Sequence, residues 1–102
     1  CTNLASVVLE EGVTSVGAEA FSDCIRLSSV VLPRSLQTVE RMAFGSTYYQ
    51  AAFYYAGTES DWQQVDDQSG NNLQSKLYYY SETKPSDTGR YWHYADGRPV
   101  RW

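Results

Sequence analysis

Histidine, cysteine and basic residues are scarce in this chain, and each scarcity excludes a class of function. The 102 residues include one histidine and two cysteines. His93 lies near the end of the sequence, whereas Cys1 and Cys24 lie near its beginning, so neither a zinc cluster nor a cysteine–histidine nucleophile is expected. Glycine-rich phosphate loops and calcium-binding loops are also missing. We therefore expect no enzyme activity, no catalytic residue, no metal and no cofactor.

Positive charge and long apolar runs are limited as well. Eight basic residues stand against twelve acidic ones, for a net charge of −4. Arg90, Arg98 and Arg101 gather near the end of the chain, where we interpret them as solvated surface and not as a phosphate-binding stripe. No apolar run reaches the length of a membrane-spanning segment. The sequence thus predicts neither nucleic acid binding nor direct membrane insertion.

What the chain does contain is an internal repeat. Residues 1–23 and 24–46 carry the same amino acid at nine of 23 aligned positions. A period of roughly 20 to 50 residues is typical of a solenoid, whose units bury their apolar faces against one another. Within each unit the pattern Leu-x-x-Val-x-Leu predicts a short strand. Val13–Val16 and Leu36–Val39 predict a second extended piece that returns the chain.

The strand pattern recurs beyond the second unit. Val7–Leu9, Val30–Leu32, Phe53–Tyr55 and Leu77–Tyr79 follow one another at offsets of 23, 23 and 24 residues. We predict that they form about four rungs of one short parallel sheet, and that their side chains alternate between two faces. The inward set is Val7, Leu9, Val30, Leu32, Phe53, Tyr55, Leu77 and Tyr79. The outward set is Val8, Val31, Tyr54 and Tyr78.

The second half of the chain adds a helix and a hairpin. Thr58–Asp61 combine an N-cap residue with acidic residues in the first turn, which predicts one short helix, with Trp62 and Val65 on one face. Gly70–Asn72 predicts a turn. After a polar loop, Tyr91–Trp102 predicts an antiparallel hairpin around an Asp-Gly turn. We expect this hairpin to cap the last rung, because a bare rung would aggregate.

These elements form one predicted domain with two parts. Residues 1–80 are the solenoid, in units 1–23, 24–46, 47–70 and 71–80, and residues 81–102 are the loop and the capping hairpin. The chain starts at Cys1 without an initiator methionine, in the middle of the repeat pattern. We therefore expect a C-terminal piece of a longer solenoid, whose uncapped first rung allows self-association.

The two cysteines occupy the same repeat position. Cys1 and Cys24 are expected one rung apart, so their Cα atoms should lie near the ~4.8 Å spacing of strands. This distance permits a disulfide, but side chains stacked in parallel favour a ladder of free thiols, and the sequence leaves the choice open. Because Cys24 repeats the position inside the chain, Cys1 is interpreted as part of the repeat and not as a lipid-modified N-terminus.

The repeat pattern also supports a family resemblance. Cys-x-x-Leu-x-x-Val-x-Leu-x-x-x-Val-x-x-Val-Gly-x-x-Ala-Phe runs over Cys1–Phe21 and recurs over Cys24–Phe44, with Glu40 where Gly is preferred. This pattern resembles the BspA-like leucine-rich repeat family. The resemblance implies a β-rich leucine-rich-repeat solenoid, classed as α/β by the convention for these repeats. It also implies a non-catalytic adhesion or protein-interaction module of a bacterial surface or secreted protein, with host or microbial proteins as partners.

Two surfaces are candidates for binding. The first is the outward ladder with its neighbour, namely Val8, Val31, Tyr54, Tyr78 and Tyr80, because repeat faces and tyrosine side chains are common in interfaces. The other interpretation of this ladder is cross-strand packing alone.

The second candidate is the aromatic hairpin, with Tyr91, Trp92, Tyr94 and Trp102. It resembles the hairpins of cell-wall and choline-binding repeats, in which aromatic walls hold sugars or quaternary ammonium groups. Those modules normally contain several tandem hairpins, so we favour the capping role for this single hairpin.

Overall fold

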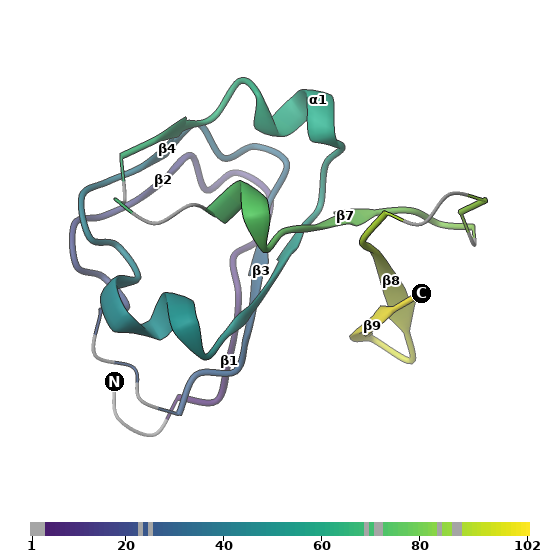
Figure 1. Ribbon diagram of the computed structural model, residues 1–102, viewed down its shortest axis with the longest axis horizontal. Helices are drawn as coiled ribbons and strands as arrows, with labels where there is room; N and C mark the ends of the chain where they lie inside the picture. The colour runs from purple at the N-terminus through teal and green to yellow at the C-terminus, as the bar shows by residue number, and fades with distance from the viewer. Residues whose placement is uncertain are drawn as a thin grey trace.

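The chain coils through two parallel β-ladders that face each other across the core (Figure 1). The computed structural model describes residues 4–22, 24, 26–68, 70, 73–83, 85–86 and 89–102. The molecule measures 36 × 29 × 25 Å. Each unit contributes one strand to the longer ladder and, where the second extended piece forms, one strand to the shorter ladder.

The larger sheet contains six strands in the order β1-β3-β5-β7-β8-β9. Its first four strands are parallel, and Val7 pairs with Val30, which pairs with Phe53. On the other face, Tyr54 pairs with Val31 on one side and with Tyr78 on the other. The pairing predicted from the repeat period is therefore confirmed. The strands are β1 (Ser6–Val8), β3 (Ser29–Leu32), β5 (Ala52–Tyr55), β7 (Tyr78–Tyr80), β8 (Tyr91–Ala95) and β9 (Arg98–Arg101).

The smaller sheet contains three short strands in the order β2-β4-β6, all parallel. They are β2 (Ser15–Val16), β4 (Thr38–Val39) and β6 (Asp66–Asp67). The first two fall within the extended pieces predicted from the sequence. The third was not predicted, because Asp66 and Asp67 carry no apolar signal and join the ladder through their backbones, with Thr38 opposite Asp66.

The core lies between the two ladders. Val30, Leu32, Phe53, Tyr55 and Leu77 are fully buried, as predicted for the inward set. The inward side chains of β1 are only partly buried, because within the described chain β1 has a strand on one side alone. The buried cluster comprises Val16, Cys24, Leu27, Val30, Leu32, Leu36, Val39, Ala43, Phe44, Ala51, Phe53, Tyr55, Trp62, Leu73 and Leu77.

In the described part of the chain, three short helical segments connect the strands: η1 (Gly45–Tyr49), α1 (Glu59–Trp62) and η2 (Leu73–Ser75). The predicted helix is confirmed as α1, but it ends at Trp62, so the expectation that the helix extends to Val65 was wrong. The Thr58 hydroxyl accepts a bond from the Asp61 N–H, and the Asp61 carboxylate accepts one from the Thr58 N–H, which completes a capping box. Trp62 is buried and meets the Tyr55 ring edge-on, with centroids 5.1 Å apart. Of the predicted turn, Gly70 has a φ of +81°, while Asn71 and Asn72 lie outside the described residues.

The predicted C-terminal hairpin is confirmed as β8 and β9, which pair antiparallel. Asp96 and Gly97 have φ values of 53° and 77°, as expected for the left-handed positions of a tight Asp-Gly turn. Strand β8 also pairs in parallel with β7, with Trp92 opposite Tyr80. The hairpin therefore continues the repeat sheet, and it also packs on the outer face of that sheet, where Val31, Tyr54 and Trp92 form a second buried cluster.

Cys24 is fully buried and disulfide-bonded, with no free thiol. The expectation of a free-thiol ladder was therefore wrong for Cys24, because the same short distance between repeat positions also permits a covalent bridge. Cys1, the other cysteine of the chain, lies outside the described residues.

Glu19 and Met42 occupy the same repeat position, and both have left-handed backbones, with φ values of 58° and 55°. This conformation costs a residue with a Cβ roughly 1–2 kcal/mol, whereas glycine adopts it freely. Because Met42 is also 45% exposed, its side chain contributes little packing, and we expect Met42→Gly to raise the free energy of unfolding by about 0.5–1 kcal/mol. Urea unfolding measures this change. The control Arg41→Gly, at a neighbouring exposed position without positive φ, should lower stability; equal losses in both variants would contradict the argument.

Candidate interaction surface

The outer face of the larger sheet is covered over part of its length. Val8 is 55% exposed, but Val31 and Tyr54 are only 2% and 7% exposed. Tyr78 and Tyr80 are half-buried. The prediction that Val31 and Tyr54 lie on an open face was therefore wrong: the hairpin folds over them, and strand alternation alone does not reveal what covers a face.

Trp92 is the side chain that fills this outer cluster. It is fully buried, and its indole Nε1–H donates to the backbone oxygen of Tyr55 at 2.8 Å. Its ring lies 5.5 Å from the ring of Tyr54 and 5.3 Å from that of Tyr80, centroid to centroid. Because its polar atom is satisfied and its faces are packed, Trp92 anchors the hairpin on the sheet.

The four aromatic residues proposed for sugar or choline binding do not form one wall. Trp92 is buried and Tyr91 is half-buried. Tyr94 packs edge-on against Trp92, whereas Trp102 stacks on His93 at 3.7 Å. Since Trp92 and His93 are successive strand residues, the two pairs lie on opposite faces of the hairpin. The inclusion of Trp92 in an open aromatic site is therefore corrected.

A groove of about 530 Å³ runs beside the covered part of the sheet. Lys76, Arg90 and Arg101 line it and come from three separate segments of the chain. Arg90 and Arg101 were expected on a solvated surface, and the sequence pattern around Lys76 gave no signal of a site. The remaining lining residues are Ser28, Gln50, Ala51, Ala52, Ser75 and Tyr78.

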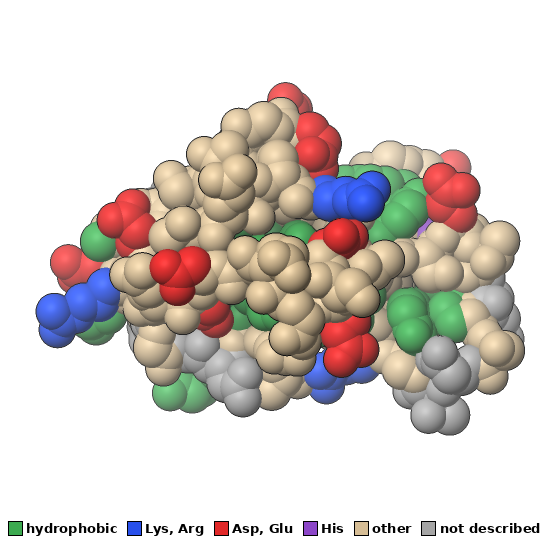
Figure 2. All heavy atoms as spheres, turned by 90° about the horizontal axis from the view of Figure 1, so that it is seen from above, with side chains coloured by type: hydrophobic (Ala, Val, Ile, Leu, Met, Phe, Trp, Pro, Cys, Tyr) green, Lys and Arg blue, Asp and Glu red, His purple; other side chains and the backbone are tan. Residues whose placement is uncertain are grey.

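The side of the molecule that carries α1 is rich in negative charge, in contrast to the groove (Figure 2). Figure 2 looks onto that side, and the charged side chains visible there are mostly carboxylates. They are dispersed across the face and do not gather at one point. Among the described residues there is no group of three or more His, Cys, Asp and Glu side chains that could hold a metal ion.

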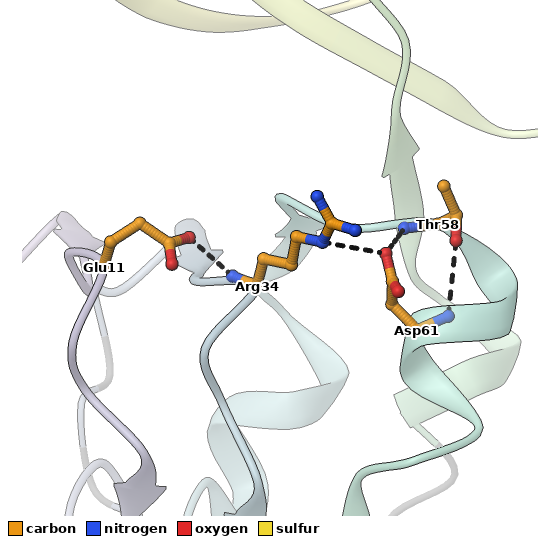
Figure 3. Close-up of polar contacts among 4 residues, drawn as sticks. All are labelled: Glu11, Arg34, Thr58 and Asp61. Atoms are coloured by element: carbon orange, nitrogen blue, oxygen red, sulfur yellow. Dashed lines mark hydrogen bonds and ion pairs between the residues drawn. The ribbon is translucent and has the colours of Figure 1, made fainter.

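Four polar residues on the α1 side link successive coils of the chain (Figure 3). The Arg34 N–H donates to Glu11 Oε1 at 2.8 Å, and the Arg34 side chain pairs with Asp61, Nε to Oδ2, at 3.3 Å. Asp61 Oδ2 in turn accepts from the Thr58 N–H at 2.9 Å. Beneath them, burial raises the pKa of the Tyr55 hydroxyl to about 12, and the charge of Asp61 adds to this rise. The carboxylates here are used in structural contacts.

Asp61 should make the stability of the protein depend on pH. The hydrogen bond from the Thr58 backbone, with help from Arg34, lowers the pKa of Asp61 below its ordinary value of 3.8. A lowered folded-state pKa stabilises the protein above the unfolded-state pKa, and this stabilisation is lost as the pH falls through the folded-state pKa. We expect Asp61→Asn to be less stable than the native chain near neutral pH and the difference to shrink below about pH 4.

Thermal unfolding at a series of pH values measures this convergence. Glu59→Gln is the matched control, because it removes a carboxylate from the same helical turn and leaves the Thr58 cap intact. A gap between Asp61→Asn and the native chain that stays constant from neutral to acid pH would contradict the assigned role of the ionised carboxylate.

The fold and its contacts define a β-rich repeat module. In both parallel ladders the first strands repeat at a spacing of 23 residues, and bonds such as Gly12 N–H to Ser35 Oγ join one unit to the next. The model of the BspA type leucine rich repeat region (6 copies) matches residues 1–60. The chain belongs to this family, whose repeats are in general non-catalytic modules for protein interaction or adhesion.

Comparisons with curated proteins and with solved structures found no significant match. Members of the family are typically associated with the cell surface or secreted. Within the described part of the chain, no helix is long and apolar enough to cross a membrane.

Proposed function

We propose that this chain is a non-catalytic protein-interaction and adhesion module at the C-terminal end of a bacterial surface or secreted leucine-rich repeat protein. In this proposal residues 1–80 are a solenoid of about four rungs, and residues 81–102 close it. The observation that carries the proposal is that the hairpin β8–β9 continues the same sheet as the repeat strands and changes its pairing from parallel to antiparallel at β9.

The chemistry of β9 supports the closing role. Pro99 lies within this edge strand and has no N–H to offer, and Arg98 and Arg101 flank the strand at its two ends. Proline and positive charge on an edge strand both oppose further strand pairing. Strand β1, at the other end of the sheet, has neither feature.

An extracellular location is supported by the disulfide at Cys24. Disulfides persist in oxidising compartments and are rare in the cytosol. The proposed partners are host or microbial proteins. They would meet the uncovered part of the outer face at Val8, with Tyr78 and Tyr80 at the margin of the hairpin.

Binding and location can be tested together. Biolayer interferometry of the full chain against purified matrix and serum proteins, run beside a glycan array and a choline titration, should give saturable binding to at least one protein. Val8→Glu should weaken this binding, whereas Thr14→Glu, an exposed position away from the sheet face, should not. Protease treatment of intact bacteria should remove the protein. Binding to glycans or choline alone, or protection from the protease, would overturn the proposal.

A further inference from the structure

We propose that the groove lined by Lys76, Arg90 and Arg101 binds a short acidic segment of a partner polypeptide. This inference rests on the proposed protein-interaction function and names the chemistry that one site would recognise. Arg90 lies beside Lys76 because it bonds to the backbone oxygens of Leu77 and Gln74, and the hairpin brings Arg101 to the same groove. Lys76 follows η2, Arg90 precedes β8, and Arg101 ends β9.

The groove differs in charge from the molecule as a whole. No described residue of its lining is acidic, although the chain carries a net charge of −4. The charged groups seen on the α1 side are mostly carboxylates (Figure 2). Three like charges that converge in one groove of an acidic protein create a local positive potential, which attracts an anionic ligand and orients it.

The three cations have neutral partners within the described chain. Arg90 donates from Nε to the oxygen of Leu77 at 3.1 Å and from Nη2 to the oxygen of Gln74 at 3.3 Å. Lys76 donates to the backbone oxygen of Tyr48. The ion pair found among the described residues joins Arg34 and Asp61, outside the groove. These bonds therefore position the cations without neutralising them.

Lys76 is partly buried and has no acidic residue beside it among the described residues of the groove, so its positive charge is both less hydrated and unpaired with a negative one. Its Nζ lies 4.8 Å from the centroid of the Tyr48 ring and 5.7 Å from that of Phe53. Removal from water lowers the pKa of Lys76. A carboxylate in the groove would offset this loss of hydration, because an opposite charge favours the protonated amine.

The guanidinium of Arg101 is positioned to bind a carboxylate. Its Nε donates to the Tyr54 hydroxyl at 3.2 Å, and its guanidinium lies 4.9 Å from the centroid of the Tyr78 ring. In the described chain neither Nη group of Arg101 has a hydrogen-bond partner. Two adjacent N–H donors on a fixed guanidinium match the two oxygens of a carboxylate.

The groove fits a peptide better than a sugar. Sugar rings bind mainly by stacking on an open aromatic face, but Arg101 lies over Tyr78 and Lys76 lies over Tyr48. The rest of the lining consists of small or polar residues such as Ser28 and Gln50. A volume of about 530 Å³ is within the usual range of ligand sites and accommodates a few residues with acidic side chains.

The test is a fluorescence anisotropy titration of the full chain with a short labelled peptide of alternating glutamate and glycine. The same peptide with glutamine in place of glutamate is the control ligand. We expect saturable binding of the glutamate peptide alone, with an affinity that falls about tenfold or more between about 0.05 M and about 0.5 M salt. The double variant Lys76→Gln/Arg101→Gln should lower the affinity about tenfold or more.

Arg98→Gln is the matched control variant, because it removes one positive charge from the same hairpin but does not line the groove. It should keep the affinity within about twofold. Since Arg101 also contacts Tyr54, thermal unfolding must show that each variant is folded. Amide chemical shifts of the native chain provide a second measurement that needs no variant: the glutamate peptide should shift the signals of Ser28, Gln50 and Ser75.

Equal affinity in the double variant and in Arg98→Gln, shifts confined to residues outside the groove, or a preference for a sulfated oligosaccharide over the peptide would each overturn the inference. If the double variant loses binding of the glutamate peptide but the interferometry finds no protein partner, the acidic-peptide site is supported and the proposed protein-interaction function is contradicted. If a protein partner binds the double variant as tightly as it binds the native chain, the proposed protein-interaction function is supported, but the groove is not the binding site for that partner.

Discussion

Replacing Trp92 by alanine is expected to lower the free energy of unfolding by about 3–5 kcal/mol, as is usual for a large buried aromatic residue. Trp92 is fully buried and joins the hairpin to the sheet through contacts with Tyr54 and Tyr80. Its loss also leaves the backbone oxygen of Tyr55 without its indole donor. Urea unfolding measures the change, and hydrogen exchange should show the amides of β8 and β9 losing protection first.

Two controls isolate this effect. Trp102→Ala removes the same kind of side chain from an exposed position on the other face of the hairpin, where Trp102 stacks on His93, and should cost about 1 kcal/mol or less. Trp92→Phe should fall between this variant and Trp92→Ala, because it keeps most of the packing and loses the hydrogen bond. Similar losses for Trp92→Ala and Trp102→Ala would show that the hairpin is not anchored through Trp92.

Phe53→Ala should destabilise the main core by a similar amount, about 3–5 kcal/mol. Phe53 is fully buried at the centre of an aromatic cluster, edge-on to Phe44 with centroids 4.9 Å apart and tilted against Tyr48 at 6.2 Å. Its neighbours belong to consecutive units, so the cavity would weaken the contact of one unit with the next. Denaturant unfolding with both fluorescence and circular dichroism measures the loss.

Tyr49→Ala is the matched control for Phe53→Ala. Tyr49 is adjacent in sequence to the same cluster but is 77% exposed, and surface substitutions usually change stability by less than about 0.5 kcal/mol. A Phe53→Ala variant as stable as Tyr49→Ala would contradict the placement of Phe53 in the shared core.

The repeat period made much of this fold predictable. A fixed offset of 23 residues assigned the pairing of Val7 with Val30 and Phe53, because parallel strands in consecutive units share a register. Local chemistry identified two further elements. Thr58 and Asp61 have the residue types of a capping box, and the Asp-Gly turn marks the hairpin.

The candidate site was far less predictable, because it depends on where the hairpin lies. Alternation along a strand correctly assigned Val31 and Tyr54 to the outer face, but it carries no information about what covers that face. The convergence of Lys76, Arg90 and Arg101 likewise follows from the tertiary fold, through the bonds of Arg90 to backbone oxygens near Lys76 and the position of the hairpin, and not from their spacing in the sequence. The composition of the outward ladder, rich in valine and tyrosine, was the one signal that this face is packed.

The two edges of the larger sheet have different consequences for polymerisation. A chain that could pair at both edges would template the next copy and grow into a fibre. Here Pro99 interrupts the backbone donors along β9, and β1 is the edge left for pairing within the described chain. We therefore expect any strand-to-strand association of isolated copies of this chain to stop at a closed pair joined through β1, because Pro99 removes a backbone donor from β9.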